Sequence, residues 1–287
     1  MSRILAPTLE IDSFAPDLTP IRTLMSRAVA PMRVRALRIR HGLQYGEALR
    51  ERARFVLNEA RNVWCTGEYR LRDSGLSVYI RHHPSPHGTP SVDTWVLREI
   101  FTDGAYSIPS AAKLPSAPHV VDLGANTGLF AAFLLSRYPA ARITAFEPDR
   151  DNARLFRDMV RRNRCGDGVV LHEACAMPTD GPVRFATGEH QFSHVAREGE
   201  RDAGVEVPGI DVFPYLDGVD LLKMDIEGGE WALLQDQRFG SAHAVVMEYH
   251  PMMCPTDDPR STAKRLLEDH GYEIVVDDEP MLWAIRR

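Results

Sequence analysis

The stretch VVDLGANTG at residues 120–128 decides the fold. Two valines and a leucine surround Asp122, a pattern typical of a buried strand that runs into a turn between Gly124 and Gly128. The G-x-x-x-G spacing differs from the G-x-G-x-x-G spacing of nicotinamide dinucleotide folds, and Asp122 would repel a pyrophosphate. The turn therefore indicates a cofactor that carries an ammonium group and no phosphate.

A second acid lies where a nucleoside cofactor needs one. The next strand candidate, ARITAFE, ends at Glu147, and an acid at this place accepts two hydrogen bonds from a ribose diol. S-adenosylmethionine has such a diol, a cationic amino-acid tail for the Asp122 region, and no phosphate. The glycines let the backbone approach closely, and asparagine tolerates unusual turn angles. The turn residues predicted to contact this cofactor are Gly124, Asn126, Thr127 and Gly128.

From residue 118 onward, short apolar strands alternate with helical segments. Helices are predicted in LFAAFLLSRYP, RDNARLFRDMVRRN and STAKRLLEDHG. The alternation predicts an α/β fold with a mainly parallel sheet covered on both faces, whose strands all end at the edge where ligands bind. The strand candidates are HVVDL, ARITAFE, GVVLHEA, GVDLLKMD, AHAVVMEYH, YEIVVDD and MLWAIRR.

The segment LLKMDIEGGE at residues 221–230 brings ionisable side chains to that edge. Alternation in an extended chain puts Lys223, Asp225 and Glu227 on one side of the strand. The two acids raise each other's pKa and the lysine lowers both, so we interpret the cluster as a general-base candidate. A lysine that pairs with an acid and caps the following helix is the structural alternative.

The next strand ends in VVMEYH, and alternation places Glu248 and His250 on one face. Asp225 is predicted to face the methyl site and the cofactor, while Lys223 or His250 helps to take the proton of an acceptor hydroxyl. Glu248 is predicted to orient the acceptor. These acids could instead hold Mg²⁺, since oxygen ligands suit that ion, but we favour a site without a metal. A buried, hydrogen-bonded His250 is the structural alternative.

These motifs resemble the FkbM-type class I methyltransferases. The matching stretches are VVDLGANTG, AFEPDRDN, LLKMDIEGGEWALL, VVMEYH and, upstream, VDTWVLREIFTDGAYSIP. The resemblance implies a Rossmann-like, seven-stranded sheet, S-adenosylmethionine, and methylation of hydroxyl groups on small metabolites or sugars. It also implies that Tyr106 and Asp93 close over the cofactor. Because residues 1–90 match nothing in the family, we expect a mostly helical N-terminal cap there and a methyltransferase domain at 91–287.

Other residues are weaker candidates. Glu173, at the end of GVVLHEA, is placed either to accept from the adenine amino group or to face solvent. Cys175 has no base partner and is interpreted as a small apolar filler. The polar segment at 186–200 is typical of a surface loop. Three of its side chains could touch the acceptor or the cofactor: Gln191, Ser193 and His194.

The N-terminal region is rich in arginine. Residues 1–72 hold 13 arginines against seven acids, with apolar residues such as Leu37, Leu43, Leu49 and Phe55 at helical spacing. One interpretation is a cap that gathers a negatively charged acceptor, such as a phosphorylated sugar or RNA. The plainer one is a solvated helical face that packs on the core or on a second copy of the chain in a homodimer. We favour the plainer one, because no aromatic residues interleave for base stacking.

Composition excludes further classes. The net charge of -6 argues against a general nucleic-acid binder, no apolar run could span a bilayer, and no signal peptide is evident. Four separated cysteines without a CxxC pair indicate reduced thiols and a cytoplasmic location. We therefore expect an S-adenosylmethionine-dependent O-methyltransferase acting on a small molecule. The alternatives are an RNA 2′-O-methyltransferase and a non-catalytic binding protein that keeps the fold.

Overall fold

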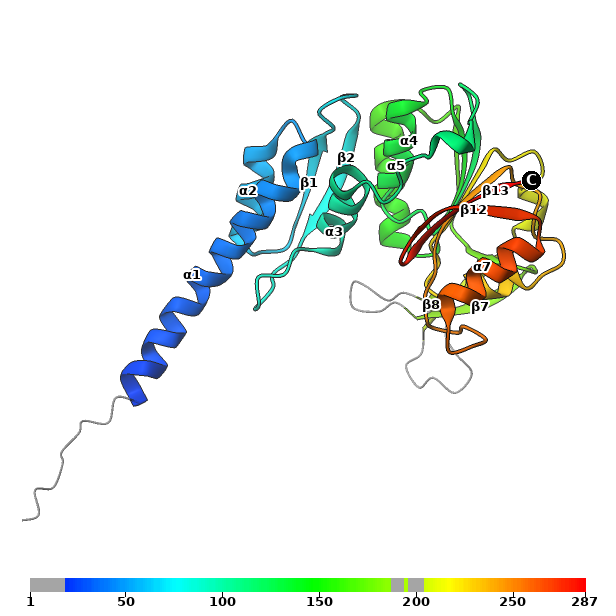
Figure 1. Ribbon diagram of the computed structural model, residues 1–287. Helices are drawn as coiled ribbons and strands as arrows, with labels where there is room; N and C mark the ends of the chain where they lie inside the picture. The colour runs from blue at the N-terminus through cyan, green and yellow to red at the C-terminus, as the bar shows by residue number, and fades with distance from the viewer. Residues whose placement is uncertain (1–18, 187–193, 196–203) are drawn as a thin grey trace, which may run out of the picture.

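The computed structural model describes residues 19–186, 194–195 and 204–287. At its centre lies a seven-stranded sheet in the order β12-β13-β11-β10-β3-β4-β5 (Figure 1). Five strands run parallel, and β13 pairs antiparallel with both β11 and β12. The predicted α/β, Rossmann-like fold is thereby confirmed. The strands are β3 (His119–Leu123), β4 (Arg142–Phe146), β5 (Val169–His172), β10 (Leu221–Met224), β11 (Ala244–Glu248), β12 (Tyr272–Asp278) and β13 (Met281–Arg286).

Helices cover both faces of this sheet, because successive strand residues point to opposite sides. In β3, Val120 belongs to the core that includes α4 and α5, while Val121 belongs to the core that includes α6 and α7. Burying each such side chain contributes about 1.5–3 kcal/mol, so the two layers form a stable platform. The helices are α4 (Leu129–Arg137), α5 (Arg150–Asn163), α6 (Glu230–Leu234) and α7 (Pro259–Asp269).

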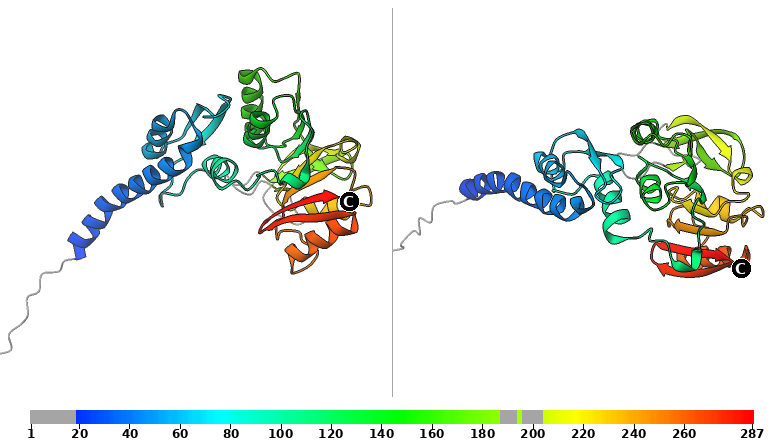
Figure 2. Two further views of the ribbon diagram at one scale, coloured as in Figure 1. Left: turned by 45° about the horizontal axis from the view of Figure 1, so that its top comes forward. Right: turned by 90° about the horizontal axis from the view of Figure 1, so that it is seen from above.

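The described part of the N-terminal region, taken with the helix that follows residue 90, contains three α-helices and a β-hairpin. Helix α1 extends away from the rest of the molecule, whereas the hairpin packs on α5 (Figures 1 and 2). Asn163, at the end of α5, bonds the amide and the carbonyl of Ser77 at 2.8 Å each. The predicted mostly helical extension is confirmed. Its elements are α1 (Thr19–Tyr45), α2 (Arg52–Arg61), β1 (Cys65–Arg70), β2 (Ser77–His82) and α3 (Val92–Arg98).

The described arginines of this region largely stabilise its own fold. Arg38 is fully buried, donates to the carbonyls of Glu59 and Thr89, and pairs with the Glu59 carboxylate at 3.0 Å. Glu59 also accepts from Thr94 at 3.1 Å, which ties α2 to α3. This bond crosses the predicted division at residue 90, which we keep as a proposal. Arginines that donate to backbone carbonyls are Arg50, Arg52, Arg54 and Arg72.

The burial expected from helical spacing is found for only some of the apolar residues of this region. Leu49 and Phe55 are fully buried, but Leu37 and Leu43 are exposed on α1. In this part of α1 the buried positions are Arg38, Gly42 and Tyr45, and Leu37 and Leu43 lie outside that face. Among the described helices, α1 included, none has the length and apolar character that crossing a bilayer requires.

A second, four-stranded sheet lies between β5 and β10 in the chain, and the sequence pattern did not predict it. Its order is β6-β9-β7-β8. Pro182 of β7 lies opposite Pro208 of β9, and proline within a run argues against a strand. Of the candidates in the predicted loop, Gln191 and Ser193 lie outside the described residues, and His194 is in β8. The strands are β6 (Cys175–Met177), β7 (Gly181–Ala186), β8 (His194–Val195) and β9 (Val205–Asp211).

Candidate active site

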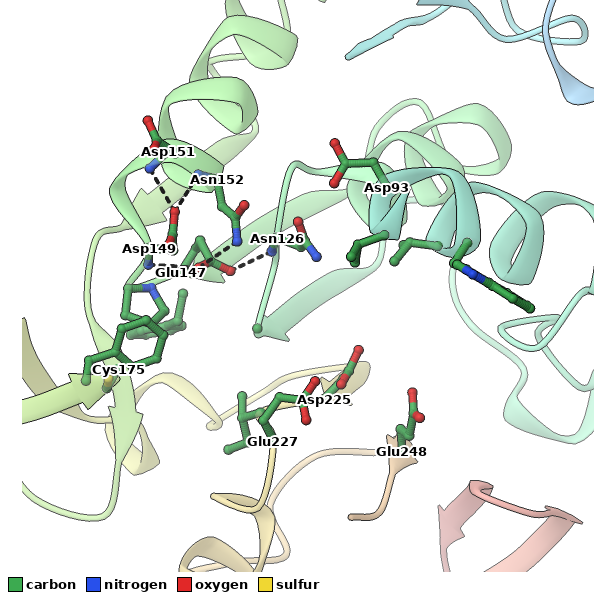
Figure 3. Close-up of a pocket in the computed structure, with 18 of the residues that line it drawn as sticks. Asp93, Asn126, Glu147, Asp149, Asp151, Asn152, Cys175, Asp225, Glu227 and Glu248 are labelled. Carbon is green, nitrogen blue, oxygen red and sulfur yellow. Dashed lines mark hydrogen bonds between the residues drawn. The ribbon is translucent and has the colours of Figure 1, made fainter. Parts of the chain in front are cut away.

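A cavity of about 890 Å³ lies at the carboxyl edge of the parallel strands (Figure 3). Its lining combines the glycine turn and the end of β4, the ends of β10 and β11, and N-terminal residues near α3. Ligand pockets measure about 300–1,000 Å³, so this cavity has room for a nucleoside cofactor together with an acceptor. Of the residues that the structure describes, eight with carboxylates and two arginines line it, which favours ligands of positive charge.

The glycine turn after β3 depends on close packing. Gly124 has φ +78°, and a Cβ there would collide with the backbone carbonyl oxygen of Asp225. Gly128 has φ +88°, and its Cβ would lie 2.7 Å from the Met159 side chain of α5. The sequence suggested that these glycines let the backbone approach a cofactor, but in the structure they let the turn approach β10 and let α4 approach α5. Asn126 adopts a positive φ of 50°, as predicted.

Glu147 is the buried acid beside the glycine turn in the cavity (Figure 3). Its Oε2 accepts from the amide of Asn126 at 2.7 Å, and its Oε1 accepts from the amide of Asp149 at 2.9 Å. The side-chain amide of Asn152 donates to Oε1 at 3.3 Å. Burial raises the pKa of Glu147 to about 7, although these N–H donors oppose the shift. The acid is therefore fixed in position beside the turn.

Asp122 and Lys223 lie opposite each other on β3 and β10, beneath the glycine turn. The Lys223 ammonium donates to the carbonyl of Gly124 at 2.7 Å and lies 3.4 Å from Asp122 Oδ1. Burial lowers the pKa of Lys223, but the charges of Asp122 and Asp225 outweigh this and raise it. Lys223 thus keeps its proton at neutral pH and is unsuited to take one from an acceptor. Neither residue lines the cavity.

Asp225 follows directly after β10 and faces the cavity (Figure 3). The hydroxyl of Tyr106 donates to its Oδ2 at 3.3 Å, and Lys223 Nζ lies 3.6 Å from the same oxygen. Burial, with the charge of Asp225, raises the pKa of Tyr106 well above its usual value, so the phenol stays neutral and remains a donor. Tyr106 does not line the cavity. It therefore positions Asp225.

Glu230 is a buried site residue that the sequence interpretation missed. Its Oε1 accepts from the amide of Ile226 at 2.8 Å and lies 3.1 Å from His250 Nδ1. Its Oε2 accepts from the amide of Gly228 at 2.9 Å. An acid in the first turn of a helix often bonds backbone amides just before it, so the sequence did contain a signal. Glu230 fixes both the loop after β10 and the ring of His250.

His250 and Glu248 complete the acidic side of the cavity. His250 Nε2 lies 3.5 Å from Glu227 Oε2, 3.8 Å from Glu248 Oε1 and 4.0 Å from Asp225 Oδ1. Burial lowers the pKa of His250, but the hydrogen bond and charge of Glu230, with Asp225 and Glu227, raise it to about 9. Burial, with Asp225, raises the pKa of Glu248 to about 8.

Three of these side chains could bind a metal ion. Ligand atoms of Asp225, Glu248 and His250 all lie within 4.8 Å of one another. The imidazole holds a proton at neutral pH, however, and would have to lose it to coordinate a metal. Two carboxylates and one protonated imidazole are a poor match for Mg²⁺, which prefers oxygen ligands in octahedral geometry.

Only some of the weaker candidate residues line the cavity. Glu173 is not brought to the cavity, because its carboxylate pairs with Arg157 of α5 on the surface. Cys175 lines the cavity, and burial raises the pKa of its thiol to about 12. Asp93 lines it too, but its carboxylate is held by Arg81 at 2.7 Å and 2.9 Å. Thr127 and Gly128 lie behind the turn and do not line the cavity. All four described cysteines are free thiols.

The parallel sheet, the glycine turn after β3 and the buried acid after β4 define a class I methyltransferase. The family model described as the methyltransferase FkbM domain matches residues 122–274, and the chain belongs to that family. This fold implies S-adenosylmethionine. The cavity fits such a cofactor, because Glu147 is buried at its wall and the excess of carboxylates suits a sulfonium cation.

Similar proteins include other methyltransferases. Methyltransferase 1 of Beauveria bassiana (strain ARSEF 2860) is 28% identical, over 64% of this chain and 82% of that protein. The 31-O-demethyl-FK506 methyltransferase FkbM of Streptomyces tacrolimicus is 24% identical, over 65% of this chain and 84% of that protein. The crystal structure of methyltransferase FkbM from Methylobacillus flagellatus KT is 17% identical with a TM-score of 0.42, covering 68% of this chain and 53% of that one.

Proposed function

We propose that this protein transfers a methyl group from S-adenosylmethionine to a hydroxyl of a small molecule, such as a sugar, a glycoside or a specialised metabolite. One observation carries the proposal: a single cavity is lined both by Glu147, beside the glycine turn, and by Asp225, Glu248 and His250. The relative from Streptomyces tacrolimicus, whose name describes an O-methyl transfer, supports an oxygen acceptor. A cytoplasmic location belongs to the same proposal.

On the cofactor side, Glu147 receives the ribose diol. Its Asn152 contact, at 3.3 Å, is the longest of the three and is the one that a ribose hydroxyl replaces. The backbone of Gly124 and Asn126 borders the nucleoside, and Asp225 attracts the ammonium of the amino-acid tail. Asp122, Lys223 and Tyr106 support these groups from behind. Charge-assisted hydrogen bonds of this kind contribute about 1.5–3 kcal/mol each.

When bound, S-adenosylmethionine supplies a methyl group on a cationic sulfur that an acceptor oxygen displaces in line. This chain's part is to hold the hydroxyl near that carbon, which can lower the barrier by about 7–11 kcal/mol. Asp225 takes the hydroxyl proton as the new bond forms, which adds about 10²–10⁴-fold. Tyr106 and Lys223 fix its carboxylate. Protonated His250, held by Glu230, and Glu248 orient the acceptor.

The RNA alternative finds no support in the arginines. Of the described arginines before residue 73, none lines the cavity. Arg38 is buried, and Arg70 pairs with Glu51 at 2.7 Å. An RNA acceptor needs free cations along its backbone. We therefore keep a small-molecule acceptor as the proposal.

Two measurements test this function. Calorimetry should detect binding of S-adenosylhomocysteine and no binding of NADH. Incubation with methyl-deuterated S-adenosylmethionine and a panel of hydroxylated sugars, glycosides and phenols should give a product with a labelled methyl ether. In Asp225→Asn, formation of that product should fall about 10²–10⁴-fold. Heat with NADH but not with S-adenosylhomocysteine would refute the cofactor. A labelled product from Asp225→Asn at the parent rate would refute the role of Asp225.

A further inference from the structure

The N-terminal region provides the wall of the cavity that faces the acidic side. Trp64 lies just before β1, His83 just after β2, and Trp95 on α3, and all three line the cavity. The indole of Trp64 and the ring of His83 have centroids 5.6 Å apart. Trp64 and Trp95 are 61% and 42% exposed, although both are large apolar side chains. Exposed aromatic side chains inside a ligand cavity are suited to stack on a ligand.

Glu99 extends this wall toward the catalytic acids. It is the first residue of a π-helical turn, Glu99–Asp103, that continues α3. Such turns are rare and often occur at functional sites. Burial raises the pKa of Glu99, and the charge of Asp225 adds to the shift. Arg98, its neighbour in the chain, pairs with Asp103 at 2.9 Å instead, and no ion pair among the described residues uses the Glu99 carboxylate.

The carboxylates of this half exceed the cations beside them. Glu99, Asp225 and Glu248 all line the cavity, and the charge of Asp225 adds to the burial that raises the pKa of Glu99 and of Glu248. Among the described residues, the cations within ion-pair distance of Asp225 and Glu248 are His250 and Lys223, and Lys223 is shared with Asp122. The ammonium of the cofactor, assigned above to Asp225, would offset the charge of that carboxylate but not those of Glu99 and Glu248. The remaining excess disfavours an anionic acceptor and favours one that brings a positive charge of its own.

We propose that the acceptor carries a protonated amine close to the hydroxyl that is methylated. Its ammonium is received by Glu99 and Glu248, and its body packs against Trp64 and Trp95. The Arg98 guanidinium already lies over the Trp95 ring, 5.2 Å from its centroid, so the carboxylates and not this ring receive the ammonium. The chemical class is an amino sugar or a hydroxylated arylalkylamine, in which the amine is on an alkyl carbon and is protonated at neutral pH. This inference rests on the proposed methyltransferase function and specifies its substrate. It makes the N-terminal region a determinant of acceptor choice by its aromatic and acidic residues and not by its arginines.

Matched pairs of ligands test the inference. With the protein saturated with S-adenosylhomocysteine, calorimetry would compare glucosamine with N-acetylglucosamine, and tyramine with N-acetyltyramine. At least one amine should bind about tenfold more tightly than its acetylated partner, and should change tryptophan fluorescence. If no amine binds more tightly than its partner, the inference is wrong. Binding of S-adenosylhomocysteine in the same samples would show that the methyltransferase proposal survives that failure.

Two variants separate the site from general charge effects. Glu99→Gln should reduce the preference for the amine over its acetylated partner about tenfold. It should leave the Kd of S-adenosylhomocysteine within about twofold of the parent value. Asp103→Asn removes the same charge from the other end of the π-helical turn, on the exposed side that pairs with Arg98, and should change neither. An equal loss in both variants, or none in Glu99→Gln, would overturn the assignment. So would tight Mg²⁺ binding that excludes the amines and disappears in Glu248→Gln.

Discussion

The two halves of the cavity bury their acids in opposite ways. On the cofactor side, Glu147 is held by three N–H donors from its own neighbourhood. On the acceptor side, Glu99 has no ion-pair partner among the described residues, and Glu248 lies within ion-pair distance of His250 alone. The first half is organised before any ligand arrives. The second half retains repulsion between carboxylates, which a cationic ligand would relieve. In our proposal, the first half therefore provides affinity for the cofactor and the second half provides selectivity among acceptors.

The largest expected effect comes from the residue where both halves meet. Gly124→Ala places a methyl group against the carbonyl of Asp225 and requires alanine at φ +78°. The backbone conformation alone costs about 1–2 kcal/mol, and with displacement of the β10 end we expect a loss of about 3 kcal/mol or more. Chemical denaturation measures this change. Gly218→Ala, at φ +65° with nothing within 4 Å, is the matched control and should lose only the backbone cost.

Equal stability losses in the two glycine variants would show that close packing at Gly124 is unimportant. The cavity halves would then be less tightly joined than the structure indicates. Loss of S-adenosylhomocysteine binding in Gly124→Ala but not in Gly218→Ala is the second expected difference, because the collision displaces Asp225.

A smaller effect distinguishes two acids at the ends of neighbouring strands. Glu147→Gln removes the charged acceptor for the ribose diol, so the Kd of S-adenosylhomocysteine should rise about 10- to 100-fold. Glu173→Gln is the control, since that side chain pairs with Arg157 outside the cavity. Its Kd should stay within about twofold of the parent value. A larger effect of Glu173→Gln than of Glu147→Gln would reverse the assignment of the cofactor side.

Glu147 and Glu173 also show which features of the site could be predicted from the sequence. The strands of the large sheet and the edge where the parallel ones end were predictable, because apolar runs ending in acids are local signals, and Glu147 and Asp225 both reach the cavity. The direction of a strand-end side chain is not local. Glu173 pairs with an arginine of α5 at the surface, and Asp122 lies opposite Lys223 of β10 in the interior. Neither contact can be obtained from spacing along one strand.

The acceptor side was predicted least well, for a related reason. Its wall comes from Trp64, His83 and Trp95, which only tertiary packing brings to the ends of β10 and β11. Glu99 lies on the same helical face as Val92, Trp95 and Val96, which also line the cavity, but spacing alone does not show which part of the molecule that face meets. The second sheet was missed because its two longest strands, β7 and β9, each contain a proline.

The cofactor side should respond to pH in a defined direction. Burial raises the pKa of Glu147 to about 7, and the ionised form is the better acceptor for a diol. Affinity for S-adenosylhomocysteine should therefore be constant above about pH 8 and fall as pH decreases through 7, being about tenfold weaker at pH 6 than at pH 8. Calorimetry over this range measures it. Glu147→Gln should flatten the profile, and an unchanged slope in that variant would assign the proton to another group.

The smallest expected effect is that of removing divalent metal ions. Asp225, Glu248 and His250 are close enough to share an ion, but His250 has its pKa raised to about 9 and already supplies a positive charge. Chelation should therefore leave the Tm and S-adenosylhomocysteine binding unchanged, and added Mg²⁺ should not raise the Tm, as binding to the folded state would require. A rise in Tm with Mg²⁺ that is lost in Glu248→Gln would give the acceptor side the counter-charge it lacks. A bound metal ion would then account for the excess of carboxylates on the acceptor side. An amine on the acceptor would no longer be needed to explain that excess.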